Sequence, residues 1–184
     1  ACAPFRRLHL CHHNLETINN TTSTTHKLLA EVCYAAIHEG ESLVKEYKEH
    51  KKKNRDFNTN LCTILARSFA DIGDIIRGKD LYLDHEPGKQ HLEERLERIF
   101  ANIQKENGDI NTLKPEEVRE YWWALNRVQV WKAITCRAEE KDIYSRIAGD
   151  TTIWNDNCGH HVNQDVPTNL DYVPQYLRWF EEWA

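Results

Sequence analysis

The stretch from Leu61 to Leu81 constrains the fold more than any other part of this sequence. Its apolar side chains recur at three- and four-residue spacing, at Leu61, Leu65, Phe69, Ile72 and Ile76. This spacing places them on one face of an α-helix. Gly78 follows at the position where a glycine commonly ends a helix. The rest of the chain must therefore supply helices that cover this apolar face.

Gly73 interrupts this helical pattern, where a glycine lowers helix stability by roughly 1 kcal/mol relative to alanine. Two interpretations are open: a close approach of another helix, or a break in the helix between Ala70 and Asp74. Asp71, Asp74 and Arg77 fall off the apolar face. No spacing typical of a catalytic site is present in the segment.

Other segments also have the amphipathic patterns of helices. We predict helices from Ser23–Thr25 to about His50, over 89–107, from Pro115 to about Cys136, and from Val173 to Ala184. Residues 1–22 are expected to be irregular, and 137–171 mostly loop. Glycine (7) and proline (5) are scarce in 184 residues, as expected of a helix-rich chain, because both disfavour helix interiors. The predicted fold class is all-α, a helical bundle.

The helix predicted from Pro115 is apolar around most of its circumference. Its apolar residues are Val118, Tyr121, Trp122, Trp123, Leu125, Val128, Val130, Trp131 and Ile134. A helix of this kind is buried on several sides. The tryptophans could form a ligand cage, but packing is the better explanation. We predict a shared buried cluster of Leu65, Phe69, Ile72, Trp122 and Leu125.

Composition excludes several classes of function. The formal charge of −5 disfavours general nucleic-acid binding. No apolar run approaches the roughly 20 residues of a membrane span, so we expect no membrane contact by this chain itself. No Ser/His/Asp, Cys/His or paired-carboxylate spacing stands out, and we expect neither an enzyme nor a cofactor.

The six cysteines, at positions 2, 11, 33, 62, 136 and 158, form no CxxC pair, which disfavours a zinc ribbon or a thioredoxin-like motif. Their even number and wide spread favour disulfides in an oxidising compartment over buried thiols. Fifteen pairings are possible, and the residues alone do not choose among them. Cys158, His160 and His161 are too few ligands for a metal site, and adjacent His12 and His13 are better explained as solvated. No metal is expected.

A basic segment ends the first long helix. It consists of Lys45, Lys48, Lys51, Lys52, Lys53 and Arg55. Cations at a helix C-terminus are stabilising, so a solvated helix end is one interpretation. The other is a binding site for an acidic glycan, because clustered lysines attract a polyanion without demanding one geometry.

Four motifs follow one another along the chain: CAPFRRLHLC at 2–11, LARSFADIGDIIRGKDLY at 65–82, REYWWALNRVQVWKAITC at 119–136 and VPTNLDYVPQYLRWFEEWA at 166–184. In this order they resemble the motifs of the Duffy-binding-like domain, and best its alpha type from the variant erythrocyte membrane proteins of the malaria parasite Plasmodium falciparum. The resemblance spans nearly the whole chain. It implies a helical adhesion domain on the outer face of the infected red cell, and not an enzyme.

The resemblance also implies an organisation and a disulfide pattern. Residues 1–22 would be a partial, irregular, disulfide-tied subdomain, 23–165 a helical-bundle subdomain, and 166–184 the first helix of a third subdomain, so that the family fold is incomplete at both ends. The implied disulfides are Cys33–Cys136 and Cys62–Cys158. Cys2 and Cys11 stay open: free, bonded to each other, or joined to a segment outside this chain.

The partners that the resemblance implies are host-cell surface receptors, sulfated glycans such as heparan sulfate, and blood-group sugars, in rosetting and cytoadherence. Antibodies would also bind such a domain, which is subject to antigenic variation. The alternative is a non-binding scaffold and immune target beside a receptor-binding neighbour.

Overall fold

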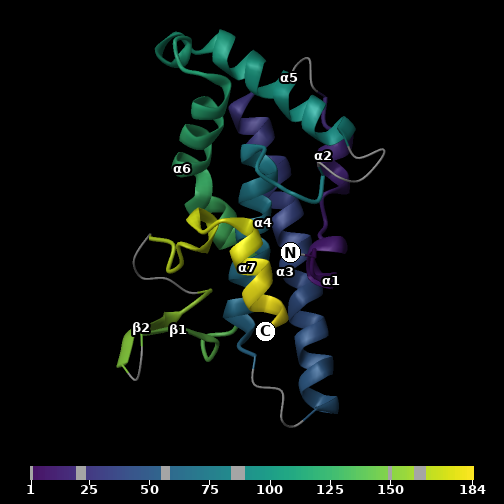
Figure 1. Ribbon diagram of the computed structural model, residues 1–184, viewed down its shortest axis with the longest axis vertical. Helices are drawn as coiled ribbons and strands as arrows, with labels where there is room; N and C mark the ends of the chain where they lie inside the picture. Colours follow the sequence, from purple (N-terminus) through teal and green to yellow (C-terminus); the bar gives the residue numbers. More distant parts are fainter. Residues whose placement is uncertain (1, 20–23, 55–58, 84–89, 149–150, 160–164) are drawn as a thin grey trace.

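The computed structural model describes residues 2–19, 24–54, 59–83, 90–148, 151–159 and 165–184. Three long helices form the bundle: α3 (Thr25–Lys53), α4 (Leu61–Arg77) and α6 (Pro115–Ile134). α5 (Gln90–Glu106) lies across one end of the bundle, and α7 (Gln175–Trp183) lies against α4 (Figure 1). The predicted all-α bundle is confirmed.

Several short elements lie in segments that we predicted to be irregular. The N-terminal segment contains two short helices, α1 (Phe5–Leu8) and α2 (His13–Thr17), and the one-turn 3₁₀ helices η1 (Gly108–Ile110) and η2 (Leu170–Tyr172) come later. The predicted loop over 137–171 is wrong in part, because it holds an antiparallel hairpin of β1 (Ile143–Ala148) and β2 (Thr151–Asn157). β-branched and aromatic residues favour these strands, and each strand supplies the hydrogen bonds of the other.

Helix α4 forms where the periodicity predicted it. The side chain of Asn60 caps its first turn by accepting a hydrogen bond from the backbone N–H of Cys62 at 2.7 Å. Gly78 ends it with a left-handed φ of +71°. The ring of Phe69, fully buried, lies 5.2 Å from the rings of both Trp123 and Trp131. The central helix is therefore wrapped by α3 and α6, as its apolar face requires.

One member of the predicted core cluster lies elsewhere. Leu65, Phe69, Ile72 and Trp122 are buried, but Leu125 is 59% exposed. Helix α6 packs against α3, α4 and α5, and these neighbours leave one face of it uncovered. Tyr121, one turn before Leu125, lies on the same outward face and is half exposed. Because α6 is apolar around most of its circumference, its sequence pattern does not indicate which face points to solvent.

Two glycines allow the helices to approach closely. α4 continues unbroken through Gly73, so the close-approach interpretation holds: a Cβ there would lie 2.7 Å from Cζ2 of Trp123. On α3, a Cβ at Gly40 would overlap the carbonyl oxygen of Ile134. Any larger side chain at either position would push the helices apart.

The structure contains one of the two disulfides that the resemblance implied. Cys62 and Cys158 are bonded, with a Cα–Cα distance of 5.8 Å, and tie the start of α4 to the segment after β2. Cys2 and Cys11 carry free thiols.

The implied Cys33–Cys136 bond is absent, and both residues are free thiols. Arg137 pairs with Glu41, which places residue 136 beside the middle of α3. Cys33 lies about two turns earlier on that helix, about 12 Å along its axis. A disulfide requires Cα atoms within about 7 Å of each other, so this arrangement of the helices keeps the two sulfurs apart.

Candidate functional site

The motifs that carry the resemblance meet inside the protein rather than on its surface. Asp71 on α4 is fully buried. Arg6 of α1 donates to its Oδ2 at 2.7 Å, and Arg178 of α7 donates to its Oδ1 at 2.6 Å. Gln175 and Trp179, also on α7, donate to Oδ1 at 3.2 and 3.3 Å. Asp71 therefore joins the N-terminal segment and the last helix to the central helix.

The electrostatics of Asp71 follow from these contacts. Burial by itself raises the pKa of the carboxyl group, but the charges of Arg6 and Arg178 outweigh burial and hold the pKa below its usual value. The group is thus an ionised carboxylate with cations on both sides. Arg6 also donates to both carboxylate oxygens of Glu182 on α7, at 3.0 and 2.8 Å.

The same pattern continues along α4. Arg178 also donates to Asp74 at 2.5 Å, and Arg77 donates to the other oxygen of Asp74 at 3.0 Å. Arg77 donates to the backbone oxygen of Asp171 in η2, and the Asp171 carboxylate accepts two hydrogen bonds from Arg127 of α6, at 2.8 and 2.7 Å. The chain of ion pairs therefore reaches from α7 to α6.

The loop after α4 is held in a similar way. Arg7 donates to both oxygens of Asp80 at 2.8 Å, and Gln175 donates to Asp80 at 2.7 Å. We call the whole set the ion network: Arg6, Arg7, Asp71, Asp74, Arg77, Asp80, Arg127, Asp171, Gln175 and Arg178. Because its charges are shielded from solvent, it specifies how the helices dock and offers little to a macromolecular ligand.

The residues of the predicted glycan site do not form one cluster. Lys45, Lys48 and Lys52 recur at i, i+3 and i+7 on one face of α3, whereas Lys53 lies about 80° round the helix from Lys45. Lys51 donates to the hydroxyl of Tyr47 at 3.2 Å. Arg55 lies outside the described residues. The helix therefore distributes the basic segment over more than one side.

The face that carries Lys45, Lys48 and Lys52 is a mixed strip rather than a purely basic one. Lys48 pairs with Glu139 at 2.7 Å, and Lys141 pairs with the same carboxylate at 2.6 Å. Hydrogen bonds from Lys141 and Lys48 lower the pKa of Glu139 to about 2. Lys45, Lys52 and Lys53 are exposed and have no hydrogen-bond or ion-pair partner among the described residues. Lys52 and Lys53 are neighbours in the last turn of α3, so they place two such cations together at the exposed end of the helix.

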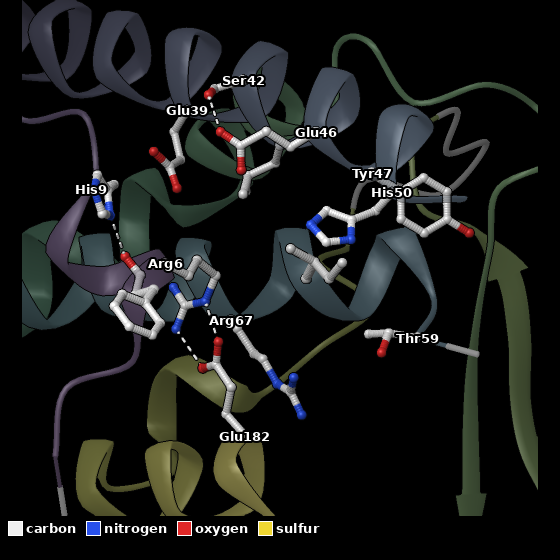
Figure 2. A pocket seen from close by; sticks show the side chains of 13 residues that line it. Arg6, His9, Glu39, Ser42, Glu46, Tyr47, His50, Thr59, Arg67 and Glu182 are labelled. Carbon is white, nitrogen blue, oxygen red and sulfur yellow. Dashed lines mark hydrogen bonds and ion pairs between the residues drawn. The ribbon is translucent and has the colours of Figure 1, made fainter. Parts of the chain in front are cut away.

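A groove of about 540 Å³ lies between α3 and α4, on the side of the bundle where α1 and α7 pack (Figure 2). Glu46 and Ser42 of α3 line one wall, and Arg67 of α4 lies on the other. No local sequence pattern indicates this groove, because its walls come from two antiparallel helices. Arg67 lies four residues before Asp71, a spacing typical of an ion pair within one helix, but Asp71 is taken by arginines from α1 and α7.

The outer face of α7 is apolar and uncovered. Tyr176, Leu177, Phe180 and Trp183 are exposed, and the ring of Trp183 meets that of Phe5 at 6.2 Å. Exposed apolar patches of this kind commonly mark contacts with other protein surfaces.

The described residues contain no cluster of three or more His, Cys, Asp or Glu side chains placed to hold a metal ion. His160 and His161, considered above with Cys158, lie outside the described residues, and Cys158 is bonded to Cys62. None of the helices described in the structure is long and apolar enough to cross a membrane.

Comparison with known proteins agrees with this architecture. The sequence profile of the Duffy binding domain matches residues 1–178. The chain belongs to the Duffy binding domain family. Among solved structures it is similar to the NTS-DBL1-alpha and CIDR-gamma double domain of the PfEMP1 protein from the Plasmodium falciparum varO strain, at 40% identity and a TM-score of 0.82, over 100% of this chain and 27% of that one.

Other members are more distant. A PfEMP1 DBL-beta domain solved bound to human ICAM-1 is 32% identical, with a TM-score of 0.71, over 97% of this chain and 38% of that one. The Duffy receptor beta form of Plasmodium knowlesi is 28% identical over 100% of this chain, and the Duffy receptor of Plasmodium vivax 27%. The chain spans 14% and 15% of the length of these two receptors. The resemblance read from the four motifs is confirmed, while the division into three subdomains stays a prediction.

Proposed function

We propose that this domain is an adhesion module displayed on the outer face of the infected red cell, where it binds host-cell receptors. The family match over residues 1–178 carries the proposal, and a related PfEMP1 domain was solved bound to human ICAM-1. The ion network supports it further, because the motifs hold the fold from inside. Exposed positions are then free to change with little effect on stability, as antigenic variation requires.

We further propose that the exposed end of α3 contributes to binding of a sulfated glycan of the heparan-sulfate type. Lys52 and Lys53 supply cations without partners among the described residues, and a sulfated glycan is a dense polyanion. The chain as a whole carries −5, so this attraction is local and falls as salt rises.

Heparin-affinity chromatography over a salt gradient tests this proposal. The variant Lys52→Glu/Lys53→Glu should elute at lower salt than the wild type, and adding Lys51→Glu should lower the eluting salt again. The matched control is Lys105→Glu/Lys132→Glu, which changes the net charge equally at two exposed positions on α5 and α6. It should elute close to the wild type, and all variants should keep the wild-type Tm, because exposed substitutions change stability little.

Equal loss of retention in both double variants would show that only net charge matters. If retention on heparin changed neither with salt nor in the α3 variants, the glycan site would not lie on α3. If the domain also bound no receptor-bearing cell, the alternative would stand: a scaffold and immune target beside a receptor-binding neighbour.

A further inference from the structure

The groove between α3 and α4 has the size and the mixed lining of a small-ligand site. Its volume of about 540 Å³ falls within the range of pockets that hold small molecules, roughly 300–1,000 Å³. Figure 2 shows side chains from both helices reaching toward it, with α1 and α7 beside one end. No lysine of the basic segment lines this groove, so the groove is a separate feature.

Arg67 is the most informative residue of the groove. The guanidinium groups of Arg6, Arg7 and Arg178 all bind buried carboxylates. Arg67, which is half-buried, makes no hydrogen bond or ion pair with any described residue. A guanidinium binds a carboxylate through two parallel hydrogen bonds, which gives both strength and orientation. The groove therefore contains a guanidinium group that can bind a carboxylate and that has no partner among the described residues.

The opposite wall offers groups that suit hydroxyls. Glu46 accepts a hydrogen bond from the Ser42 hydroxyl at 3.2 Å, and the Thr59 side chain lines the groove near its other end. Carboxylate oxygens accept hydrogen bonds and hydroxyl groups both donate and accept. A ligand that carries several hydroxyl groups can satisfy both kinds of group at once.

The remaining wall is apolar. Leu43 and Ile64 line it from α3 and α4, and the ring of Tyr47 lies at the end near Thr59. The C–H face of a sugar ring can rest on such a surface while its hydroxyls point to the polar walls.

The other carboxylates of the groove are already engaged. Glu182 is bound by Arg6, while Glu39 accepts hydrogen bonds from the Ser68 hydroxyl at 2.8 Å and the Cys11 backbone N–H at 3.1 Å. Burial raises the pKa of Glu39, although hydrogen bonds from Cys11 and Ser68 act in the opposite direction. These partners occupy the two carboxylates and reduce the repulsion that an anionic ligand would meet.

We propose that the groove binds an acidic sugar residue of a host-cell glycan, with its carboxylate on Arg67, its hydroxyls on Glu46, Ser42 and Thr59, and its apolar face on Ile64. This rests on the proposed adhesive function and adds a second, more selective contact. The exposed end of α3 binds according to the total negative charge of the ligand, whereas the groove binds one carboxylate at a fixed position.

NMR titration of the 184-residue chain with two simple sugars tests the inference. Methyl glucuronide and methyl glucoside differ only in a carboxylate that replaces a hydroxymethyl group. The glucuronide should shift the backbone amides of residues 42–50 and 64–67, and should bind at least about tenfold more tightly than the glucoside, as one charge-assisted hydrogen bond provides. Equal binding of the two sugars, or no binding of either, would overturn the inference without any variant.

Two variants separate the roles of the walls. Arg67→Gln should abolish the preference for the glucuronide, and Glu46→Gln should weaken both sugars alike. The control is Arg98→Gln, an exposed arginine on α5, which should leave both affinities unchanged. A preference that survives Arg67→Gln would refute the assignment, and an acidic peptide that binds the groove more tightly than the glucuronide would replace the sugar by a protein segment.

The outcome is separable from that of the proposed function. Heparin itself contains uronic acid residues, so Arg67→Gln should lower heparin retention less than Lys52→Glu/Lys53→Glu does, and the groove is judged by the loss of the glucuronide preference alone. Loss of the groove interaction alone would therefore leave the adhesive function intact.

Discussion

Replacing Asp71 by Asn tests whether the buried ion network holds the two ends of the chain on the bundle. The substitution keeps the shape of the side chain and removes its charge. Arg6 then faces an amide group in place of an oxygen, although it keeps Glu182. Arg178 keeps Asp74. Each arginine therefore loses one of two carboxylate partners.

Removing one partner of a buried ion pair costs about 3–5 kcal/mol, and the retained partners favour the lower end of that range. With a urea m-value of about 2 kcal/mol/M, the unfolding midpoint should fall by roughly 1.5–2 M. The assay is urea unfolding followed by tryptophan fluorescence. Asp109→Asn, on the exposed η1, is the control and should change the free energy of unfolding by less than about 0.5 kcal/mol.

The effect should also be local. Asp71 accepts hydrogen bonds from three side chains of α7 and from none of α5. In Asp71→Asn, backbone hydrogen exchange should therefore speed up more in α7 than in α5. Because the folded pKa of Asp71 is lowered, its stabilisation is present above the unfolded value of about 3.8 and is lost as pH falls through the folded pKa. A loss below about 1 kcal/mol at pH 7, or equal exchange in α5 and α7, would refute the reasoning.

Three further predictions concern two residues of α3 and the free thiols of Cys33 and Cys136. Gly40→Ala should destabilise the protein by about 3 kcal/mol or more in thermal unfolding, because the new methyl group overlaps the Ile134 carbonyl, whereas Gly108→Ala, with open space around it, should not. Burial raises the pKa of Glu39 above 4.5, so the contribution of Glu39 to stability is greatest below pH 4.5 and declines as pH rises. Glu39→Gln should therefore make a plot of Tm against pH flatter above pH 4.5. A slope equal to that of the wild type would contradict this prediction. Mass mapping without reduction should find Cys33 and Cys136 alkylated after unfolding, and a peptide that links them would show that the helices adopt another arrangement.

The sequence by itself determined the helices of the bundle. The spacing of Leu61, Leu65 and Phe69 is a local property, and so are a capping side chain and a terminal glycine such as Gly78. The four motifs were likewise enough to indicate the family. The hairpin over 143–157 was missed because short strands that pair only with each other carry a weak periodic signal beside long helices.

Only the tertiary structure decided where the polar residues of the motifs lie. Asp71 and Asp74 fall off the apolar stripe of α4 and look solvent-exposed in the sequence, yet both are buried. Their partners Arg6 and Arg178 lie more than 60 positions away in opposite directions along the chain, so no local pattern reveals the pairing. The same limit applied to Leu125, whose exposure depends on which faces of α6 the neighbouring helices cover. It also applied to Arg67, because only the folded structure shows that it has no partner among the described residues. Periodicity specifies which residues share a face of a helix, and packing between helices specifies what that face meets.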